Sequence, residues 1–270
     1  MPELPEVEIV TRALSRKLKG RSILEHRVHH PGVLLHDPHA GLGGPLRRFE
    51  RGERHGKYMV LEFSSEQRLV VHLRMTGAFY FRDSDTPLQP HTHVEFQLDT
   101  GEWLAYRDPR RFGRIWWLSP NSSTNPLADL GPDALRLSQP EWVARISERS
   151  RMMKPLLLDQ AVIAGLGNIY VDELLHRSRI HPQRAADSIP AARLGEMWSA
   201  CRELLRLAIR NGGSSIRSFV DTDGILGNYQ NFHLVYAREG EPCTTCGTLI
   251  KRIVVAQRGT WICPRCQRRR

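Results

Sequence analysis

The sequence predicts an α+β protein with an N-terminal β-sandwich, a helical second domain and a small cysteine-rich C-terminal module. Three observations support this fold class. Short apolar runs between turn residues extend from Ile23 to Leu118, helix-spaced apolar residues begin after Pro132, and two C-x-x-C pairs lie near the end of the chain. Strands grouped first and helices grouped later are typical of α+β organisation. A length of 270 residues accommodates two domains and one small module.

One helix is expected before the strands. Its apolar residues recur at spacings of three and four, at Val7, Val10, Leu14 and Leu18. This spacing predicts an amphipathic helix with Pro5 in its first turn and Gly20 near its end. Pro2 and Glu3 therefore stand just before a helix N-terminus, where backbone N–H groups and the helix dipole favour anions.

The N-terminal domain is expected to span residues 1–118. Its apolar runs, each bounded by turn residues, are 58–63, 69–73, 93–98, 103–106 and 115–118. Several short strands in succession favour a β-sandwich. Residues 119–131 are rich in Ser, Asn, Pro and Gly and are predicted to be an interdomain linker.

The domain expected over 132–235 is helical. Helix-like apolar spacing occurs in 142–150, 155–160, 169–178 and 191–211. The sequence Gly165-Leu-Gly-Asn168 separates two of these segments, which predicts a helix–two-turn–helix. Its glycines let backbone amides approach a phosphate, and Asn168 adds a side-chain donor at a helix start. The alternative is a plain helix cap.

The C-terminal module, 236–270, contains two C-x-x-C pairs separated by residues 247–262. The four cysteines are Cys243, Cys246, Cys263 and Cys266. This spacing matches a zinc ribbon, and four thiolates make a closed, structural site for one zinc ion. The alternative is two disulfides, which are rare in a cytosolic chain, and nothing at the N-terminus resembles a signal peptide.

The charge of the chain indicates an anionic partner. The net charge is +10 with a sequence pI near 9.8, and the last 30 residues hold seven basic residues and one acidic residue. A basic zinc module is typical of binding to a phosphate backbone. We expect Arg258, between the cysteine pairs, to contact DNA, whereas Arg268 to Arg270 suit a solvated tail. No apolar stretch approaches 18 residues, so no membrane span is expected.

The first six residues, Met1-Pro-Glu-Leu-Pro-Glu6, offer a nucleophile. Removal of Met1 would leave Pro2 as an N-terminal secondary amine, and an α-amino group has a pKa of about 7.7–8.0. Such an amine is a better nucleophile near neutral pH than an exposed lysine. Glu3 is placed to move protons beside it, and Glu6 supports the helix start or the site. The alternative is that Pro2 and Pro5 only stiffen the helix entrance.

Together these features resemble the bacterial formamidopyrimidine-DNA glycosylase / endonuclease VIII family. The resemblance extends from Pro2 to Cys266. Its further motifs are Gly56-Lys-Tyr58, His72-Leu-Arg-Met75, Asp108-Pro-Arg-Arg-Phe-Gly113, Gly165-Leu-Gly-Asn-Ile-Tyr170 and Arg238-Glu-Gly-Glu-Pro-Cys243. The Pro-Glu-Leu start is similar to the formamidopyrimidine branch.

The resemblance implies a bifunctional DNA glycosylase and AP lyase of base excision repair that removes 8-oxoguanine and formamidopyrimidines. By motif, Pro2 is the nucleophile that forms a Schiff base, Glu3 shuttles protons, and β,δ-elimination follows. Lys57 resembles the family lysine that binds phosphate beside the lesion. The implied partner is double-stranded DNA with oxidised bases or abasic sites, and we expect a monomer in the cytoplasm, associated with the nucleoid.

The same resemblance implies a set of DNA contacts. Met75, Arg110 and Phe112 match the wedge that fills the stack when a base is flipped out. His72, Asn168 and Arg258 are the further expected DNA-binding residues. The alternative for Met75 and Phe112 is a place in the hydrophobic core.

One segment departs from the family pattern. Residues 219–235 occupy the place of the lesion-recognition loop, but Ile225-Leu-Gly227 stands where the family usually has Lys-Pro-Gly. The lesion preference is therefore open between oxidised purines and an endonuclease VIII-like preference for oxidised pyrimidines. A non-catalytic zinc-ribbon DNA-binding protein is the alternative from another class.

Overall fold

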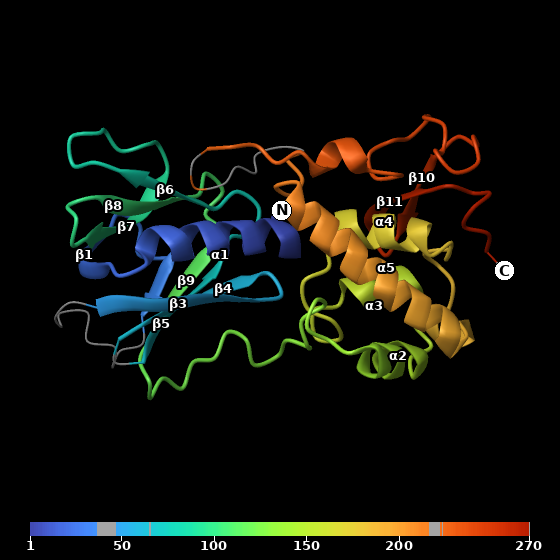
Figure 1. Ribbon diagram of the computed structural model, residues 1–270, viewed down its shortest axis with the longest axis horizontal. Coiled ribbons are helices and arrows are strands. Elements are labelled where there is room, and N and C mark those ends of the chain that lie inside the picture. Colours follow the sequence, from blue (N-terminus) through green and yellow to red (C-terminus); the bar gives the residue numbers. More distant parts are fainter. Residues whose placement is uncertain (37–46, 65, 216–221, 223, 270) are drawn as a thin grey trace. The chain divides into compact units, whose positions relative to one another are not determined.

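The computed structural model describes residues 1–36, 47–64, 66–215, 222 and 224–269 (Figure 1). Its contacts divide the chain into two compact units. The first comprises Met1–Asp129 and Gly212–Asn228, and the second comprises Leu130–Asn211 and Tyr229–Arg270. The described residues between 212 and 228 therefore pack with the N-terminal unit, although the helical domain predicted over 132–235 includes them. The domain boundaries expected from the sequence stay predictions.

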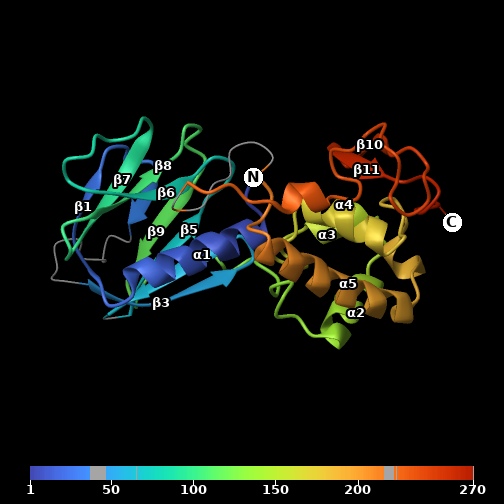
Figure 2. The same ribbon diagram turned by 45° about the horizontal axis from the view of Figure 1, so that its top comes forward.

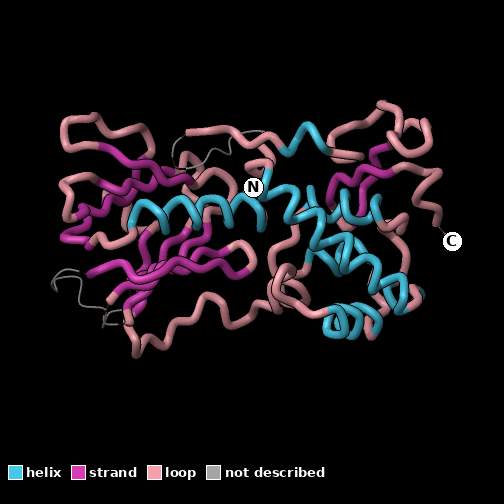
Figure 3. Tube along the Cα trace, viewed as in Figure 1, coloured by secondary structure: helices cyan, strands magenta, loops and turns pink. Residues whose placement is uncertain are grey.

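The first unit is built on a nine-stranded sheet, counted over the residues that the structure describes. Its strands are β1 (Ser22–Val28), β2 (Leu34–His36), β3 (Arg47–His55), β4 (Tyr58–Phe63), β5 (Gln67–His72), β6 (Ala78–Arg82), β7 (Thr92–Leu98), β8 (Trp103–Arg107) and β9 (Arg114–Leu118). Their order is β2-β9-β5-β4-β3-β1-β7-β8-β6, and the neighbouring strands are antiparallel except for β2 and β9. These strands gather in one unit together with the long helix α1 (Leu4–Leu18) (Figure 3).

The two halves of this sheet enclose one core. They join through a short pairing, in which Ser22 and Ile23 of β1 face Arg48 and Arg47 of β3. Buried side chains from β7 and β8, such as Phe96, share a hydrophobic cluster with side chains from β4, β5 and β9. The β-sandwich expected from the sequence is therefore confirmed, as a single sheet folded onto itself.

The apolar runs expected to be strands appear as β4, β5, β7, β8 and β9. Strand β3 was not expected, because its sequence from Arg47 to His55 is almost entirely polar. It is ordered by backbone pairing with β4, which runs in one register from Arg51–Glu62 to His55–Tyr58 and shifts by one residue before the Phe49–Phe63 pair. A strand whose side chains mostly face solvent is held in the sheet by its backbone hydrogen bonds. Its sequence therefore shows no alternation of apolar and polar residues from which the strand could be predicted.

Helix α1 (Leu4–Leu18) begins one residue after Glu3 and carries Pro5 in its first turn. Its apolar face, including Val7, Val10 and Leu14, packs into the sandwich core. The helix contacts β3 and β4. The predicted helix is confirmed, and its N-terminus brings Pro2 and Glu3 to a fixed place at the end of the sandwich.

The second unit is helical where the sequence predicted it. Its helices are α2 (Gln139–Ser147), α3 (Met153–Leu158), α4 (Asn168–Arg177) and α5 (Ala191–Arg210), with a short 3-10 turn at Ala186–Ser188. Helix α5 packs against α2 and α4 (Figure 2). Helix α2 begins three residues before the predicted Trp142, because Ser138 and Glu141 form a capping box. Cys201 is fully buried in α5.

The chain ends in a small ribbon within the second unit. A 3-10 turn at Tyr229–Phe232 leads into it, and strands β10 (Lys251–Val255) and β11 (Arg258–Ile262) form an antiparallel hairpin. Ala256 and Gln257 make the two-residue turn, with φ of 47° and 60°. This turn fixes Arg258 as the first residue of β11. None of the described helices combines the length and apolarity that crossing a membrane requires.

Candidate functional site

The N-terminus of α1 is organised by the buried Glu6. Its carboxylate accepts the backbone N–H of Glu3 at 2.8 Å through Oε2, and the backbone N–H of Ser214 at 2.8 Å through Oε1. Pro2, Glu3 and Glu6 are all buried. Because a buried carboxylate is costly unless it is hydrogen-bonded, both backbone donors are held to Glu6. Pro2 and Glu3 are thereby fixed at the start of the helix.

The segment that meets Glu6 requires glycine. Gly213 has φ of +72°, and a Cβ there would lie 2.8 Å from Glu6 Oε1. Gly227 lies directly against the carbonyl oxygens of Gly212 and Gly213, and its N–H donates to Ser215 Oγ at 2.8 Å. Residues 212–215 and 227 therefore form a close-packed strap over the start of α1.

The segment expected to be the lesion-recognition loop is only partly described. Residues 219–221 and 223 lie outside the described residues. Ile225 and Leu226, which stand where the resemblance leads us to expect Lys-Pro, are 63% and 66% exposed. They precede Gly227 and so present apolar side chains next to the strap.

A partly buried ion pair connects α1 to the turn that carries Lys57. Arg54 of β3 donates to Glu8 of α1 at 2.8 Å through Nε, and to the carbonyl oxygen of Gly56 at 3.0 Å through Nη1. Gly56 and Lys57 form the two-residue turn between β3 and β4, with Gly56 at φ of +57°. Because Arg54 touches both helix and turn, the position of Lys57 depends on α1.

His72 is held as a neutral hydrogen-bond donor close to Lys57. Burial, followed by the positive charges of Arg74 and Lys57, lowers the pKa of His72 to about 3. Its Nδ1 accepts the backbone N–H of Arg74 at 2.9 Å. The ring proton therefore resides on Nε2, which can donate to an acceptor such as a phosphate oxygen.

Met75, Arg110 and Phe112 are brought together on the surface. Arg110 Nη1 lies 3.0 Å from Met75 Sδ, and the Arg110 guanidinium stands 4.7 Å from the centre of the Phe112 ring. Phe112 is 49% exposed. Two apolar side chains joined through one guanidinium, with the aromatic ring open to solvent, make a surface suited to stacking against a base.

Asp108 shapes the loop that carries Arg110 and Phe112. Its buried carboxylate accepts the backbone N–H of Gly113 at 2.7 Å and of Arg110 at 3.2 Å, and also accepts the Thr76 hydroxyl. The Tyr106 hydroxyl is buried against Gly113 and has no hydrogen-bond partner among the described residues. The conformation of the loop is therefore fixed by hydrogen bonds to Asp108 and by close packing of Gly113 against the Tyr106 hydroxyl.

We predict that Gly113→Ala displaces this loop, because the added Cβ would overlap the Tyr106 hydroxyl. Overpacking of this kind costs about 1–3 kcal/mol. Tyr106→Phe removes an unpaired hydroxyl and should cost little alone. In the double variant it should restore much of the lost stability. Thermal unfolding of the four proteins tests the cycle, and equal destabilisation of Gly113→Ala with and without Tyr106→Phe would contradict the packing assignment.

In the second unit, a buried ion pair supports the start of β11. Lys154 Nζ lies 2.6 Å from Asp172 Oδ1 and donates to the Gly259 carbonyl oxygen at 3.1 Å. Asp172 also accepts the Trp261 N–H at 3.1 Å through Oδ2. Burial raises the pKa of Asp172 to about 7, although the Lys154 charge acts to lower it. The pair therefore fixes both ends of the Gly259–Trp261 backbone, next to Arg258.

The sequence predicts that the Asn168 side chain donates to a phosphate, but in the structure it donates to a backbone carbonyl of the ribbon. As the first residue of α4, it donates from Nδ2 to the Gly259 carbonyl oxygen at 2.9 Å. Asn168 thus helps Lys154 hold the ribbon, and only its second amide hydrogen remains to meet a phosphate. Arg258 itself is exposed at the head of β11.

Breaking the Lys154–Asp172 pair should destabilise the second unit strongly. Lys154→Met leaves the Asp172 carboxylate buried without its cation, and such losses cost about 3–5 kcal/mol. The matched double variant, Lys154→Met with Asp172→Leu, removes both charges and should recover a large part of this. Denaturant unfolding checks both variants. Full stability of Lys154→Met alone would show that the pair does not hold the ribbon.

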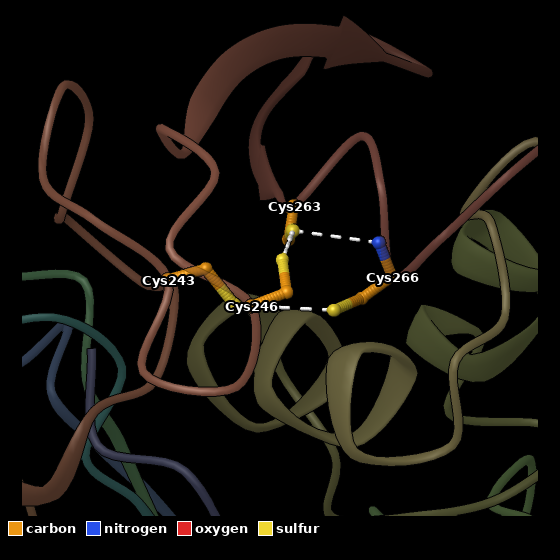
Figure 4. A group of neighbouring side chains, drawn as sticks. All are labelled: Cys243, Cys246, Cys263 and Cys266. Atoms are coloured by element: carbon orange, nitrogen blue, oxygen red, sulfur yellow. Dashed lines mark hydrogen bonds between the residues drawn. The ribbon is translucent and has the colours of Figure 1, made fainter.

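The four cysteines of the ribbon converge on one point, with their sulfur atoms turned toward one another (Figure 4). All four Sγ atoms lie within 4.8 Å of each other, with Cys246–Cys263 at 3.4 Å and Cys243–Cys266 at 3.9 Å. A zinc–sulfur bond of about 2.3 Å in a tetrahedron implies sulfur separations of about 3.8 Å. The cysteines fit one structural zinc ion, and none of them forms a disulfide.

Several residues that position the site escaped the sequence analysis. Glu8, Arg54, Lys154 and Asp172 appear in the sequence as ordinary charged residues. A weak signal existed for Lys154, since lysine is rare beside arginine in this chain. Asp108 lay inside a motif but had no role assigned.

Three family profiles match the chain. "Formamidopyrimidine-DNA glycosylase N-terminal domain" matches residues 1–115, "Formamidopyrimidine-DNA glycosylase H2TH domain" matches 130–220, and "Zinc finger found in FPG and IleRS" matches 240–269. The formamidopyrimidine-DNA glycosylase of Herpetosiphon aurantiacus is 42% identical, over 99% of this chain and all of that protein. The enzyme of Bacillus anthracis is 40% identical over the full length of both.

Solved structures resemble the chain over nearly all of its length. A Lactococcus lactis FPG variant in complex with Fapy-dG-containing DNA has a TM-score of 0.90 at 33% identity, covering 99% of this chain and all of that one. MutM in complex with DNA that contains carbocyclic 8-oxo-G has a TM-score of 0.89 at 33% identity, with the same coverage. The Lactococcus lactis enzyme has also been solved with DNA containing an abasic site, at a TM-score of 0.89.

Proposed function

Because the chain belongs to the formamidopyrimidine-DNA glycosylase family, we propose that it removes 8-oxoguanine and formamidopyrimidines through a Schiff base on Pro2, followed by β,δ-elimination. The chain is a DNA-formamidopyrimidine glycosylase of base excision repair. The observation that carries the mechanism is the buried start of α1. There Glu6 fixes the backbone of Glu3 next to Pro2.

The nucleophile in this proposal is the secondary amine that Pro2 acquires when Met1 is removed. Its nitrogen attacks C1′ of the damaged nucleotide, and the bond from C1′ to the base breaks with its electron pair leaving on the base. Opening of the sugar ring then gives an iminium ion, which a secondary amine can form. The helix N-terminus behind Pro2 stabilises anions, so it favours the phosphates that flank the sugar.

Glu3 supplies the proton transfer. A proton must reach the sugar ring oxygen or the departing base as the C1′ bond breaks, and the Glu3 carboxyl is one residue from the nucleophile. The iminium then acts as an electron sink: loss of a C2′ proton expels the 3′ phosphate, and a second elimination expels the 5′ phosphate. The product is a one-nucleotide gap.

The remaining site residues bind the DNA. Lys57 and the Nε2–H of His72 suit phosphates beside the lesion, and Asn168 and Arg258 suit phosphates bound by the second unit. Met75, Arg110 and Phe112 fill the stack after the damaged base flips out. The partner is double-stranded DNA with oxidised bases or abasic sites. We propose that the enzyme acts as a monomer in the cytoplasm, associated with the nucleoid.

Borohydride trapping tests the nucleophile. Incubation with an 8-oxoguanine duplex and borohydride should give a covalent adduct on the peptide that begins at Pro2. Protein that retains Met1 has an amide nitrogen at Pro2 and should give no adduct, because an amide is not nucleophilic. Pro2→Gly should also lose trapping while its duplex affinity is kept. An adduct on Lys57 or Lys154 would refute the assignment.

The same assay with a thymine-glycol duplex separates the lesion classes. Faster excision of thymine glycol than of 8-oxoguanine would favour the endonuclease VIII-like alternative, for which the exposed apolar pair Ile225–Leu226 is the supporting observation. Binding without excision of either base would favour a non-catalytic zinc-ribbon protein.

The wedge makes a separate prediction. Phe112→Ala should slow excision from a lesion-containing duplex by about 10-fold or more, because unstacking a base costs a few kcal/mol. The effect on an abasic duplex should be much smaller, since unstacking there is already cheap. Because Phe112 is half exposed, the melting temperature should hardly change. Equal losses on both substrates together with a lower melting temperature would indicate a core role instead.

A further inference from the structure

The ribbon is attached to helix α4 by three side chains on one face of that helix. Asp172 accepts the Trp261 N–H, and Glu173 accepts the backbone N–H groups of Leu234, Val235 and Tyr236 at 2.9–3.0 Å. His176 lies four residues after Asp172 and three residues after Glu173, and its side chain contacts Cys243, one of the metal-binding cysteines. Residues at such spacings lie on the same side of a helix.

His176 contacts a cysteine that binds the metal. Its Nε2 lies 3.4 Å from Cys243 Sγ, and both side chains are 3% exposed. A zinc-bound thiolate has no hydrogen to donate, so the hydrogen in this contact must belong to His176. The other ring nitrogen, Nδ1, is buried and has no hydrogen-bond partner among the described residues.

The position of the ring hydrogen follows from these contacts. A hydrogen on Nδ1 alone would leave a buried donor unsatisfied and would turn the Nε2 lone pair toward the sulfur. A hydrogen on Nε2 satisfies the donor and leaves only an acceptor unpaired. Because an unpaired buried donor costs about 1–3 kcal/mol, the N–H···S arrangement is strongly favoured.

A zinc ion with four thiolates carries two net negative charges, and hydrogen bonds to the sulfurs offset them. The backbone N–H of Cys266 donates to Cys263 Sγ at 3.4 Å. Cys243 is buried, whereas Cys246, the other cysteine of its C-x-x-C pair, is partly exposed. The donor to Cys243 is His176, which belongs to helix α4 and not to the ribbon. Groups that orient ligands in this way commonly change metal affinity by about 10–100-fold when they are removed.

We propose that His176 is a positioning residue of the zinc site, whose Nε2–H donates to the Cys243 thiolate, slows zinc release and shields this sulfur from electrophiles. The metal site is therefore completed by helix α4 and is not contained within the ribbon. Zinc occupancy and the attachment of the ribbon to α4 stabilise each other.

Zinc release from the holoprotein to a chromophoric chelator tests this proposal. His176→Phe keeps a ring of similar shape but cannot donate, and it should release zinc about 10-fold faster. His176→Gln keeps an N–H donor and should restore most of the retention. The matched control is His181→Phe, which alters a buried histidine whose Nδ1 accepts the Gln183 N–H instead of meeting a sulfur, and it should release zinc at the wild-type rate.

Two further measurements distinguish a hydrogen bond from His176 to the Cys243 sulfur from simple packing of the ring against it. In the cobalt-substituted protein, His176→Phe should shift the sulfur-to-cobalt charge-transfer bands, and His176→Gln should shift them much less. Alkylation by N-ethylmaleimide, mapped by mass spectrometry, should modify Cys243 faster in His176→Phe. Equal lability of the Phe and Gln variants, or unchanged zinc release and unchanged bands in His176→Phe, would overturn the proposal.

The unaltered protein gives an independent answer if a variant fails to fold. With ¹¹³Cd in the site and ¹⁵N-labelled histidine, the Nε2 hydrogen of His176 should show scalar coupling to cadmium across the N–H···S bond. A ring protonated only on Nδ1, without that coupling, would refute the proposal.

Discussion

The carboxylate of Glu6 is the constraint on which the N-terminal site depends. It is buried, and it accepts one N–H from the residue beside Pro2 and another from Ser214, far along the chain. A buried carboxylate can keep its charge only with such donors, so the start of α1 and the glycine strap are fixed together. The requirement for Gly213 follows directly, since any side chain there would meet Glu6.

The same principle organises the second unit around α4. Asp172 and Glu173 are adjacent buried carboxylates, and each accepts backbone N–H groups of the ribbon or of the chain leading into it. The ribbon has a very small apolar core, centred on Val235 and Ile250, and would not hold its shape alone. Zinc inside it and α4 beside it supply the missing stability, and Arg258 is presented from the resulting rigid hairpin.

Local patterns explain which parts of the molecule the sequence predicts. Helix α1, strand β4 and the cysteine pairs follow from apolar spacing and residue identity over short stretches. Strand β3 does not, because its order comes from pairing with β4 and β1 and its side chains are polar. For the same reason Glu8, Arg54 and Lys154 were missed: their roles exist only once distant segments meet. Met75, Arg110 and Phe112 lie beside one another in the structure, and their role as a wedge stays a prediction, since the sequence alone left a core position open for Met75 and Phe112.

The central proposal is that the nitrogen of Pro2, held in place through Glu6, forms the covalent bond to the DNA. A crystal structure of the borohydride-reduced complex with an 8-oxoguanine duplex tests it most directly. We expect a covalent bond between the Pro2 nitrogen and C1′, with Glu6 still accepting the N–H groups of Glu3 and Ser214. A bond from C1′ to a lysine Nζ, or a Glu6 carboxylate turned away from both donors, would contradict it.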